Sequence, residues 1–383
     1  MANPRKIPAT TAGKIIKCKA AVLWGPRQPL RMQEVEVAPP QKMEVRVKIL
    51  FTSVCPGDIV TWSFQGPFFP MIMGHEATGV VESVGEGVTG LVAGDTVMTV
   101  YTGECGECAH CKSEESNLCS LLCFKFIEGL KICEGTPRFL VEGKPAYHYA
   151  TTSTFTEYTV CPAGCVFKIN RLAPLDKICA LSCGVVSGLG SVLNVARPTE
   201  DSSVAIFGLG LTGLAAAEAA RIAGASQIIC IDVDVNKLRK AVGFGMTYFL
   251  NPPRYNMPIK DIIVDMTRGG ADRSVDCTGD ISCMRCAFEC VHKEWGIAVL
   301  NALSREKLRT DSLKFAGERT LKGCYFGNYK PRSQLPSLVD MVMKGELDMD
   351  KFITYRFRFA EINEALLRSL TDATILLCIV AME

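Results

Sequence analysis

Apolar positions in the first hundred residues form short runs that alternate with polar positions and are separated by glycine and proline. The runs at 19–24 (KAAVLW), 44–51 (EVRVKILF) and 79–85 (GVVESVG) have the length and pattern of β-strands. We therefore expect the N-terminal part of the chain to be rich in strands.

From about residue 200 the pattern changes. Val204–Phe207 predicts a short buried strand, the Ala-rich stretch Leu211–Ala223 predicts a helix, and Ile228–Ile231 predicts a second strand with a helix running on through Lys240. This strand–helix–strand alternation is typical of a parallel, doubly wound α/β sheet. After about residue 326 the pattern becomes irregular again, with a helix expected over Leu335–Met343.

The pattern therefore predicts a nucleotide-binding domain over 185–325, inserted into a strand-rich domain made of 1–184 and 326–383. A chain of 383 residues is long enough for two such domains, each with its own core. Lys plus Arg total 42 and Asp plus Glu total 40, a net charge of +2, which argues against general nucleic-acid binding. We find no apolar run of the roughly 18 residues that a membrane span needs and no secretory signal, so we expect a cytoplasmic protein.

Nineteen cysteines without a secretory signal suggest metal ligands and buried thiols rather than disulfides. Four of them have the spacing C-x2-C-x2-C-x7-C: Cys105, Cys108, Cys111 and Cys119. On a polar, Gly-containing lobe this spacing suits a tetrahedral structural zinc site. An iron–sulfur cluster is the main alternative, and coincidental buried thiols are a weaker one. His110 lies among these cysteines, and a solvated side chain is a simpler interpretation than a fifth ligand.

A glycine-rich turn follows the predicted strand: Gly208-Leu209-Gly210-Leu211-Thr212-Gly213. The motif alone is weak, because it also fits a structural turn. Here it opens a helix, and Asp232 stands 19 residues after its last glycine at the end of the next strand. This context predicts dinucleotide binding, with an acid that accepts from a ribose 2′-hydroxyl and favours NAD over NADP. Lys237 assists at the adenosine side or is an ordinary surface lysine.

A third set of candidates is dispersed. Cys55, His75 and Cys183 would form a three-ligand zinc site with an open fourth position, which is the catalytic pattern. Taken singly, each is more often a buried thiol or a hydrogen-bonded core histidine. Their separation in sequence does not by itself bring them together.

With these motifs the chain resembles the zinc-dependent medium-chain alcohol dehydrogenases, and within them the plant alcohol dehydrogenases. The segments that carry the resemblance are ILFTSVC (49–55), GHEATGVVESVGEGV (74–88), FTEYTV (155–160), SVAIFGLG (203–210) and FGNYKP (326–331). It implies a Rossmann domain inserted in a GroES-like catalytic domain and a homodimer joined through the nucleotide-binding sheets.

The resemblance also implies roles for single residues. Cys55, His75 and Cys183 match the catalytic zinc ligands, and Glu76 matches a glutamate that approaches the metal during ligand exchange. Asp58 matches the carboxylate that orients the ligand histidine. The four cysteines of the lobe match the structural zinc ligands, which makes two zinc ions per subunit. Ser187 falls where the family has a small hydroxyl residue behind the nicotinamide.

The chain departs from the family at the proton relay. The family has Ser or Thr where this chain has Gly57, and often His or Tyr where it has Val60, so neither step of the usual relay has a side chain that carries a proton. Pro56 and Leu377 replace basic or imidazole residues that lie near the pyrophosphate. A missing acid–base group typically costs 10²–10⁴ in rate, so we expect poor ethanol oxidation.

We therefore expect an NAD(H)-dependent zinc oxidoreductase that reduces a bulky aldehyde or a conjugated enal or iminium in specialised plant metabolism. Its reaction would be on a carbonyl or, in the alternative, on a carbon–carbon double bond. The candidate pocket residues are Trp62, Tyr101, Phe124, Tyr149 and Leu303. The competing hypotheses are a conventional alcohol dehydrogenase that uses water in place of the relay, and a non-catalytic redox sensor that uses the remaining cysteines.

Overall fold

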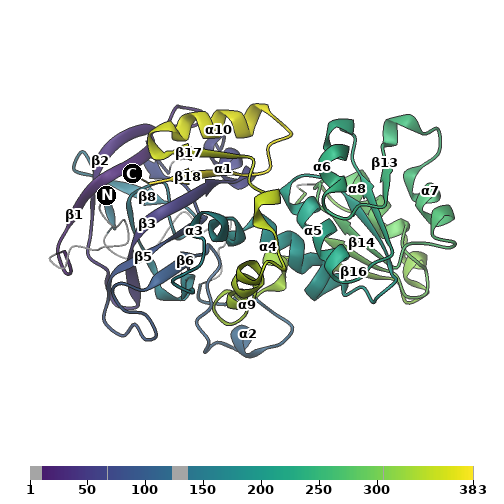
Figure 1. Ribbon diagram of the computed structural model, residues 1–383, viewed down its shortest axis with the longest axis horizontal. Coiled ribbons are helices and arrows are strands. Elements are labelled where there is room, and N and C mark those ends of the chain that lie inside the picture. Colours follow the sequence, from purple (N-terminus) through teal and green to yellow (C-terminus); the bar gives the residue numbers. More distant parts are fainter. Residues whose placement is uncertain (1–10, 67, 123–136, 305, 383) are drawn as a thin grey trace. The chain divides into compact units, whose positions relative to one another are not determined.

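The structure, a computed structural model, describes residues 11–66, 68–122, 137–304 and 306–382. The chain divides into two units (Figure 1): a first unit that ends at Cys183 and resumes at Lys330, and a second unit over Gly184–Tyr329. The sequence placed the second boundary at 325/326 instead of 329/330. The difference arises because Gly327 packs on the second unit, where its carbonyl accepts a hydrogen bond from Asn194 Nδ2 at 2.9 Å.

The first unit consists mainly of strands. In chain order they are β1 (Ile16–Leu23), β2 (Arg31–Val37), β3 (Glu44–Val54), β4 (Met71–Ile72), β5 (Ala77–Val84), β6 (Thr96–Thr99), β7 (Phe139–Val141), β8 (Lys144–His148), β9 (Tyr158–Pro162), β10 (Val166–Lys168), β17 (Tyr355–Arg358) and β18 (Cys378–Ala381). Its α-helices are α1 (Pro56–Trp62), α2 (Ala109–Lys112), α3 (Leu175–Ile178), α9 (Pro331–Lys344) and α10 (Ile362–Thr371).

These strands form a barrel and a sheet. β1, β2, β7, β8 and β4 close into the barrel, whereas the sheet has the order β10-β6-β5-β3-β18-β17, with β9 pairing with β3 as well. β18 runs antiparallel to β3, and Figure 1 shows the C-terminal strands (yellow) beside this early strand. β3 is paired on both sides and largely buried, which explains its long apolar run. The C-terminal segment thus completes the sheet begun by the first strands.

The second unit has a six-stranded parallel sheet among the residues described. Its strands are β11 (Ser203–Phe207), β12 (Gln227–Ile231), β13 (Tyr248–Leu250), β14 (Arg273–Asp276), β15 (Ile297–Leu300) and β16 (Thr320–Gly323), and its α-helices are α4 (Gly184–Gly190), α5 (Leu211–Ile222), α6 (Leu238–Val242), α7 (Ile259–Met266) and α8 (Ile281–Glu289). The order β13-β12-β11-β14-β15-β16 reverses direction between β11 and β14, which makes the sheet doubly wound. The helix expected through Lys240 consists of a 3-10 turn at Val235–Lys237 followed by α6, which ends at Val242.

The core of this sheet explains its strand pattern. Ala205 and Phe207 of β11 lie in one buried cluster with Ile263 of α7 and Phe288 of α8. α5, which is nearly continuous in alanine, packs on β11, β12 and β14. Because both faces of a parallel sheet are covered, its central strands β11 and β12 are almost continuously apolar instead of alternating.

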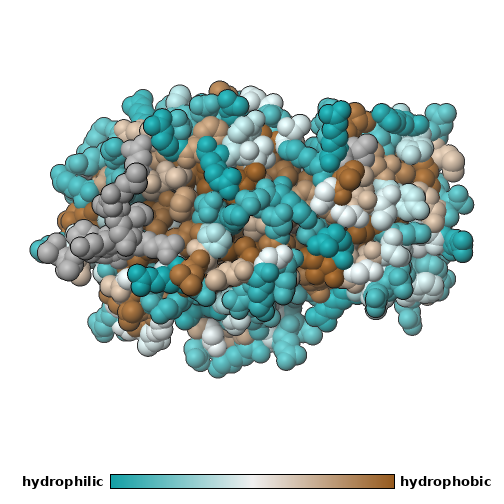
Figure 2. Space-filling model, viewed as in Figure 1, coloured by the Kyte–Doolittle hydropathy of each residue, from teal (hydrophilic) through white to brown (hydrophobic). Residues whose placement is uncertain are grey.

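Polar residues (teal in Figure 2) cover most of the visible face, with apolar residues in scattered groups. In the part of the chain that the structure describes, no single helix is long and apolar enough to cross a membrane. One bent pair, 175–182 with 184–196, meets that test only when its two helices are combined.

Candidate functional site

The first unit brings four dispersed residues together. Single ligand atoms of Cys55, His75, Glu76 and Cys183 all lie within 4.8 Å of one another. Cys55 precedes α1 at the end of β3, His75 precedes β5, and Cys183 ends the first part of this unit. The two sulfur atoms are 3.9 Å apart, and both thiols are free. Two thiols, one imidazole and one carboxylate are a donor set that suits zinc.

Asp58 fixes the orientation of the histidine. Its Oδ1 is 3.2 Å from His75 Nδ1, and its Oδ2 accepts the Cys55 N–H at 2.9 Å. Burial opposes protonation of His75, but the Asp58 carboxylate prevails and raises the imidazole pKa well above its ordinary value. Since Nδ1 is held by Asp58, Nε2 is the nitrogen that faces the two cysteines.

Glu76 lies near Nε2 of the imidazole, the nitrogen that is not paired with Asp58. Its Oε1 is 3.8 Å from His75 Nε2, and this oxygen is buried without a hydrogen-bond partner among the described residues. The other carboxylate oxygen accepts a hydrogen bond from the Ser53 hydroxyl. Burial raises the pKa of Glu76. A buried carboxylate oxygen without a partner, next to three potential ligands, fits a site that takes a cation.

The pKa of both cysteine thiols in this cluster is raised above its ordinary value. The hydrogen bond with Cys183, followed by burial, raises the pKa of Cys55 well above its ordinary value. Metal binding at this cluster therefore has to displace a proton.

Replacing Asp58 by asparagine tests the orienting role. The amide still accepts the Cys55 N–H but loses the negative charge beside His75 Nδ1. We expect zinc affinity at this cluster to fall about 10–100-fold, measured by competition with a chromophoric chelator. The matched control is Asp261→Asn on the exposed side of α7, which should leave the zinc affinity of this cluster unchanged. Unchanged affinity in the Asp58 variant would contradict this role.

Two aromatic rings flank the imidazole. Tyr101 and Tyr149 meet the His75 ring edge to face, with centroid distances of 5.4 and 5.6 Å. The Tyr149 hydroxyl donates to the Gly57 carbonyl at 3.2 Å. Burial raises the pKa of Tyr149, so its hydroxyl remains protonated and able to donate. Two pocket candidates therefore adjoin the cluster.

A third pocket candidate, Trp62, lies at a separate cavity of the first unit. The Trp62 indole donates to the Gln28 carbonyl at 2.7 Å and lines a cavity of about 220 Å³ with residues of α10, including Leu366. Leu303 belongs to the second unit and is 83% exposed. Phe124 lies outside the described residues.

The residues that replace family positions have ordinary structural roles. Pro56 occupies the first turn of α1, where its missing N–H costs nothing. Leu377 is fully buried in the first unit, and Val60 is half exposed.

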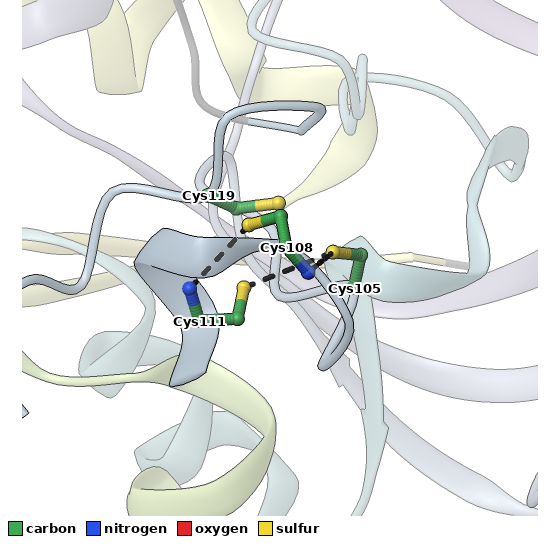
Figure 3. Close-up of side chains that lie close together, drawn as sticks. All are labelled: Cys105, Cys108, Cys111 and Cys119. Carbon is green, nitrogen blue, oxygen red and sulfur yellow. Dashed lines mark hydrogen bonds between the residues drawn. The ribbon is translucent and has the colours of Figure 1, made fainter. Parts of the chain in front are cut away.

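The four spaced cysteines form a second cluster in the first unit (Figure 3). Their four sulfur atoms all lie within 4.8 Å of one another. Backbone N–H groups of Cys108 and Cys111 donate to the sulfurs of Cys105 and Cys108, each at 3.4 Å. Hydrogen bonds from Ser120 and the backbone lower the pKa of Cys108 to about 5, which favours the thiolate. The arrangement fits a four-thiolate metal site.

The lobe that carries these cysteines is tied to α9. Lys330 Nζ donates to the carbonyls of Cys111 and Ser113 at 2.8 and 2.7 Å. Glu104 accepts the N–H groups of Arg332 and Ser333 in the first turn of α9. His110, by contrast, turns away from the sulfurs, with its Nδ1 2.7 Å from the Leu118 carbonyl oxygen.

The glycine-rich turn of the second unit leaves room for a ligand beside its backbone. A Cβ on Gly210 would meet nothing within 4 Å, whereas a Cβ on Gly213 would lie 1.7 Å from the Gly208 carbonyl oxygen. Gly208 has φ +87°, which favours glycine. α5 begins directly after Gly210, and no side chain caps its first turn. An open backbone approach at an uncapped helix N-terminus suits a pyrophosphate. Leu211 and Thr212 form the first residues of that helix.

Asp232 also shapes this turn. Its Oδ2 accepts the Leu209 N–H at 2.7 Å and the Lys237 ammonium at 3.0 Å, and its Oδ1 accepts the Asp234 N–H at 2.9 Å. The carboxylate is thus held at the end of β12, next to the glycines. Lys237 pairs with it instead of extending freely into solvent.

The structure adds residues that the sequence did not single out. Asn301, directly after β15, donates through Nδ2 to the Ser187 carbonyl at 3.1 Å. The Ser53 hydroxyl donates a hydrogen bond to the Glu76 carboxylate. Each is a common residue type outside any motif, so only the fold reveals its partner.

Two clusters of potential zinc ligands and a doubly wound sheet with a glycine-rich turn define a zinc-binding dinucleotide dehydrogenase. Residues 41–171 match the family model described as alcohol dehydrogenase GroES-like domain, and 212–344 match the model described as zinc-binding dehydrogenase. The chain belongs to the zinc-dependent medium-chain alcohol dehydrogenase family, which confirms the fold expected from the sequence.

Individual relatives agree. The chain is 57% identical to alcohol dehydrogenase 2 of Solanum tuberosum over 98% of this chain and 100% of that protein. It is 56% identical to alcohol dehydrogenase 1 of Oryza sativa subsp. indica over 93% and 95%. Among solved structures it resembles benzyl alcohol dehydrogenase from Acinetobacter calcoaceticus, with a TM-score of 0.86, 25% identity and coverage of 96% and 100%. The chain is thus an oxidoreductase of the alcohol dehydrogenase type, with a small-molecule alcohol or carbonyl compound as its substrate.

Proposed function

We propose that the chain is an NAD(H)-dependent reductase of bulky, planar aldehydes in specialised plant metabolism. The observation that carries this proposal is the pair of tyrosine rings that meet His75 edge to face within the ligand cluster. Aromatic walls favour a planar conjugated or aromatic substrate. Similarity to a benzyl alcohol dehydrogenase supports an aromatic substrate, and similarity to plant enzymes supports the setting.

The zinc-ligand cluster would hold the metal and the substrate oxygen, and the glycine-rich turn of the second unit would hold the cofactor. When bound, zinc supplies a Lewis acid and the dinucleotide supplies the hydride. Cys55, His75 and Cys183 would hold the metal, and Asp58 keeps the imidazole in the ligand orientation. Glu76 is placed to approach the same position during exchange of ligands.

The second unit would hold the cofactor. The backbone at Gly210 and the first turn of α5 receive the pyrophosphate, and Asp232 accepts from a ribose hydroxyl. Because a carboxylate repels a 2′-phosphate, we propose NAD(H) over NADP(H). Ser187, whose backbone carbonyl accepts a hydrogen bond from Asn301, would lie behind the nicotinamide. The four cysteines of the lobe would hold a second, structural zinc.

The reaction type is tested with NADH deuterated at its transferable position. The zinc-loaded protein is given a panel of aromatic aldehydes, saturated aldehydes and conjugated enals, and NMR locates the label in each product. We expect deuterium on the former carbonyl carbon of the aromatic aldehydes. Deuterium at the β-carbon of an enal would instead assign conjugate reduction, and no transfer to any member would contradict the proposal.

The competing hypotheses give different results in the same assay. A conventional alcohol dehydrogenase would show its highest kcat/KM on ethanol and short aldehydes. A non-catalytic redox sensor would bind NADH without transferring the label.

A further inference from the structure

We propose that the Tyr149 hydroxyl donates the hydrogen bond and the proton to the reacting oxygen of the substrate. This inference rests on the proposed carbonyl reduction and identifies the chain's own donor for it. Neither Gly57 nor Val60 has a side chain that carries a proton, so the donor has to come from another element.

The first argument is position. A Cβ built on Gly57 would lie 4.0 Å from His75 Nε2, the ligand nitrogen, and 3.6 Å from the Tyr149 hydroxyl oxygen. The phenol therefore reaches, from another part of the fold, the space that a side chain at 57 would occupy beside the cluster. The absence of a side chain at Gly57 leaves that space open.

The second argument is that the phenol is held firmly while its hydrogen remains free to turn. Tyr149 is 7% exposed, its ring contacts His75, and its N–H donates to Ser153 Oγ at 2.8 Å. The hydroxyl donates to the Gly57 carbonyl at 3.2 Å, a long hydrogen bond to a neutral acceptor. A hydroxyl hydrogen rotates about its C–O bond, so it can leave this carbonyl for a substrate oxygen on the same side.

The proton balance of the step is simple. Hydride forms the new C–H bond as the carbonyl π-bond breaks, and the Tyr149 proton moves to the substrate oxygen. A proton from water replaces it on the phenol, which ends neutral, and the product is the alcohol.

The test compares Tyr149→Phe with Tyr147→Phe, a control that removes a hydroxyl from a residue 39% exposed on β8. In the zinc-loaded protein we expect Tyr149→Phe to lower kcat/KM for an aromatic aldehyde on the order of 10²-fold. It should also weaken binding of trifluoroethanol to the NAD⁺ complex about 3–10-fold by calorimetry, because a hydrogen bond to the ligand is lost. Zinc content should be unchanged, and the control should match the wild type.

One further variant separates a proton donor from a packing residue. Gly57→Ser in the Tyr149→Phe background places a hydroxyl where the phenolic oxygen has been removed, so it should restore part of kcat/KM and of trifluoroethanol affinity.

The outcomes distinguish this inference from the proposed function. Unchanged kinetics and affinity in Tyr149→Phe, or no recovery in the double variant, would overturn the inference while wild-type activity stands. Failure of the wild type on every carbonyl would overturn the proposed function, independently of the variants.

Discussion

Cys183→Ala is expected to lower aldehyde turnover on the order of 10³-fold or more and to reduce zinc from about two ions per subunit to about one. The substitution removes one of three ligands from a cluster whose two sulfur atoms are 3.9 Å apart. A metal that polarises a carbonyl contributes several kcal/mol to the transition state, and each 1.36 kcal/mol is tenfold in rate. Elemental analysis and steady-state kinetics on the same preparation measure both effects.

Cys230→Ala is the matched control. This thiol lies fully buried in β12 of the second unit, outside both clusters. Its loss leaves a small cavity and a modest drop in melting temperature, with zinc content and kinetics retained. If Cys183→Ala kept two zinc ions and full turnover, the catalytic cluster would have to be reassigned. Loss of activity in the Cys230 variant with its zinc intact would show that this thiol does more than fill the core.

The sequence predicts best those parts of the fold whose information is local. The strand at 204–207, its glycine turn and the following helix are contiguous, and the structure has β11 and α5 there. The four-cysteine lobe is equally local, since its ligands span only 105–119. In both cases a single turn or loop brings the residues together without help from distant strands.

The catalytic cluster has no such local information. Cys55, His75 and Cys183 are separated by 20 and 108 residues, and they meet only because β3 and β5 pair and the chain returns to them. The family resemblance supplied the grouping that the spacing did not. The barrel strands β7 and β8 were likewise missed, because runs of three and five residues carry little pattern.

The aromatic residues show why pocket residues are harder to predict. Tyr149 and Trp62 are both large and partly polar, and neither belongs to a ligand motif. Only the fold separates them, since one ring contacts His75 and the other lines a cavity beside α10.

Cys111→Ala is expected to unfold the four-cysteine lobe and to leave the catalytic cluster loaded. Structural zinc in small lobes contributes about 10–16 kcal/mol of apparent binding energy, comparable with the whole stability of a domain. The lobe is short of apolar contacts and is tied to α9 by Lys330 and by Glu104. Zinc should fall to about one per subunit, and amide exchange should rise sharply over 105–119 and at the first turn of α9.

The control for this variant is His110→Ala. Its imidazole faces the Leu118 carbonyl and not the sulfurs, so zinc content should stay at about two ions and exchange over the lobe should change little. The spread of exchange into α9 is the informative part, because the Glu104 carboxylate accepts N–H groups of that helix. If Cys111→Ala retained slow exchange in the lobe with only one zinc bound, the lobe would be stable without its metal. Its four cysteines would then have to be explained as buried thiols.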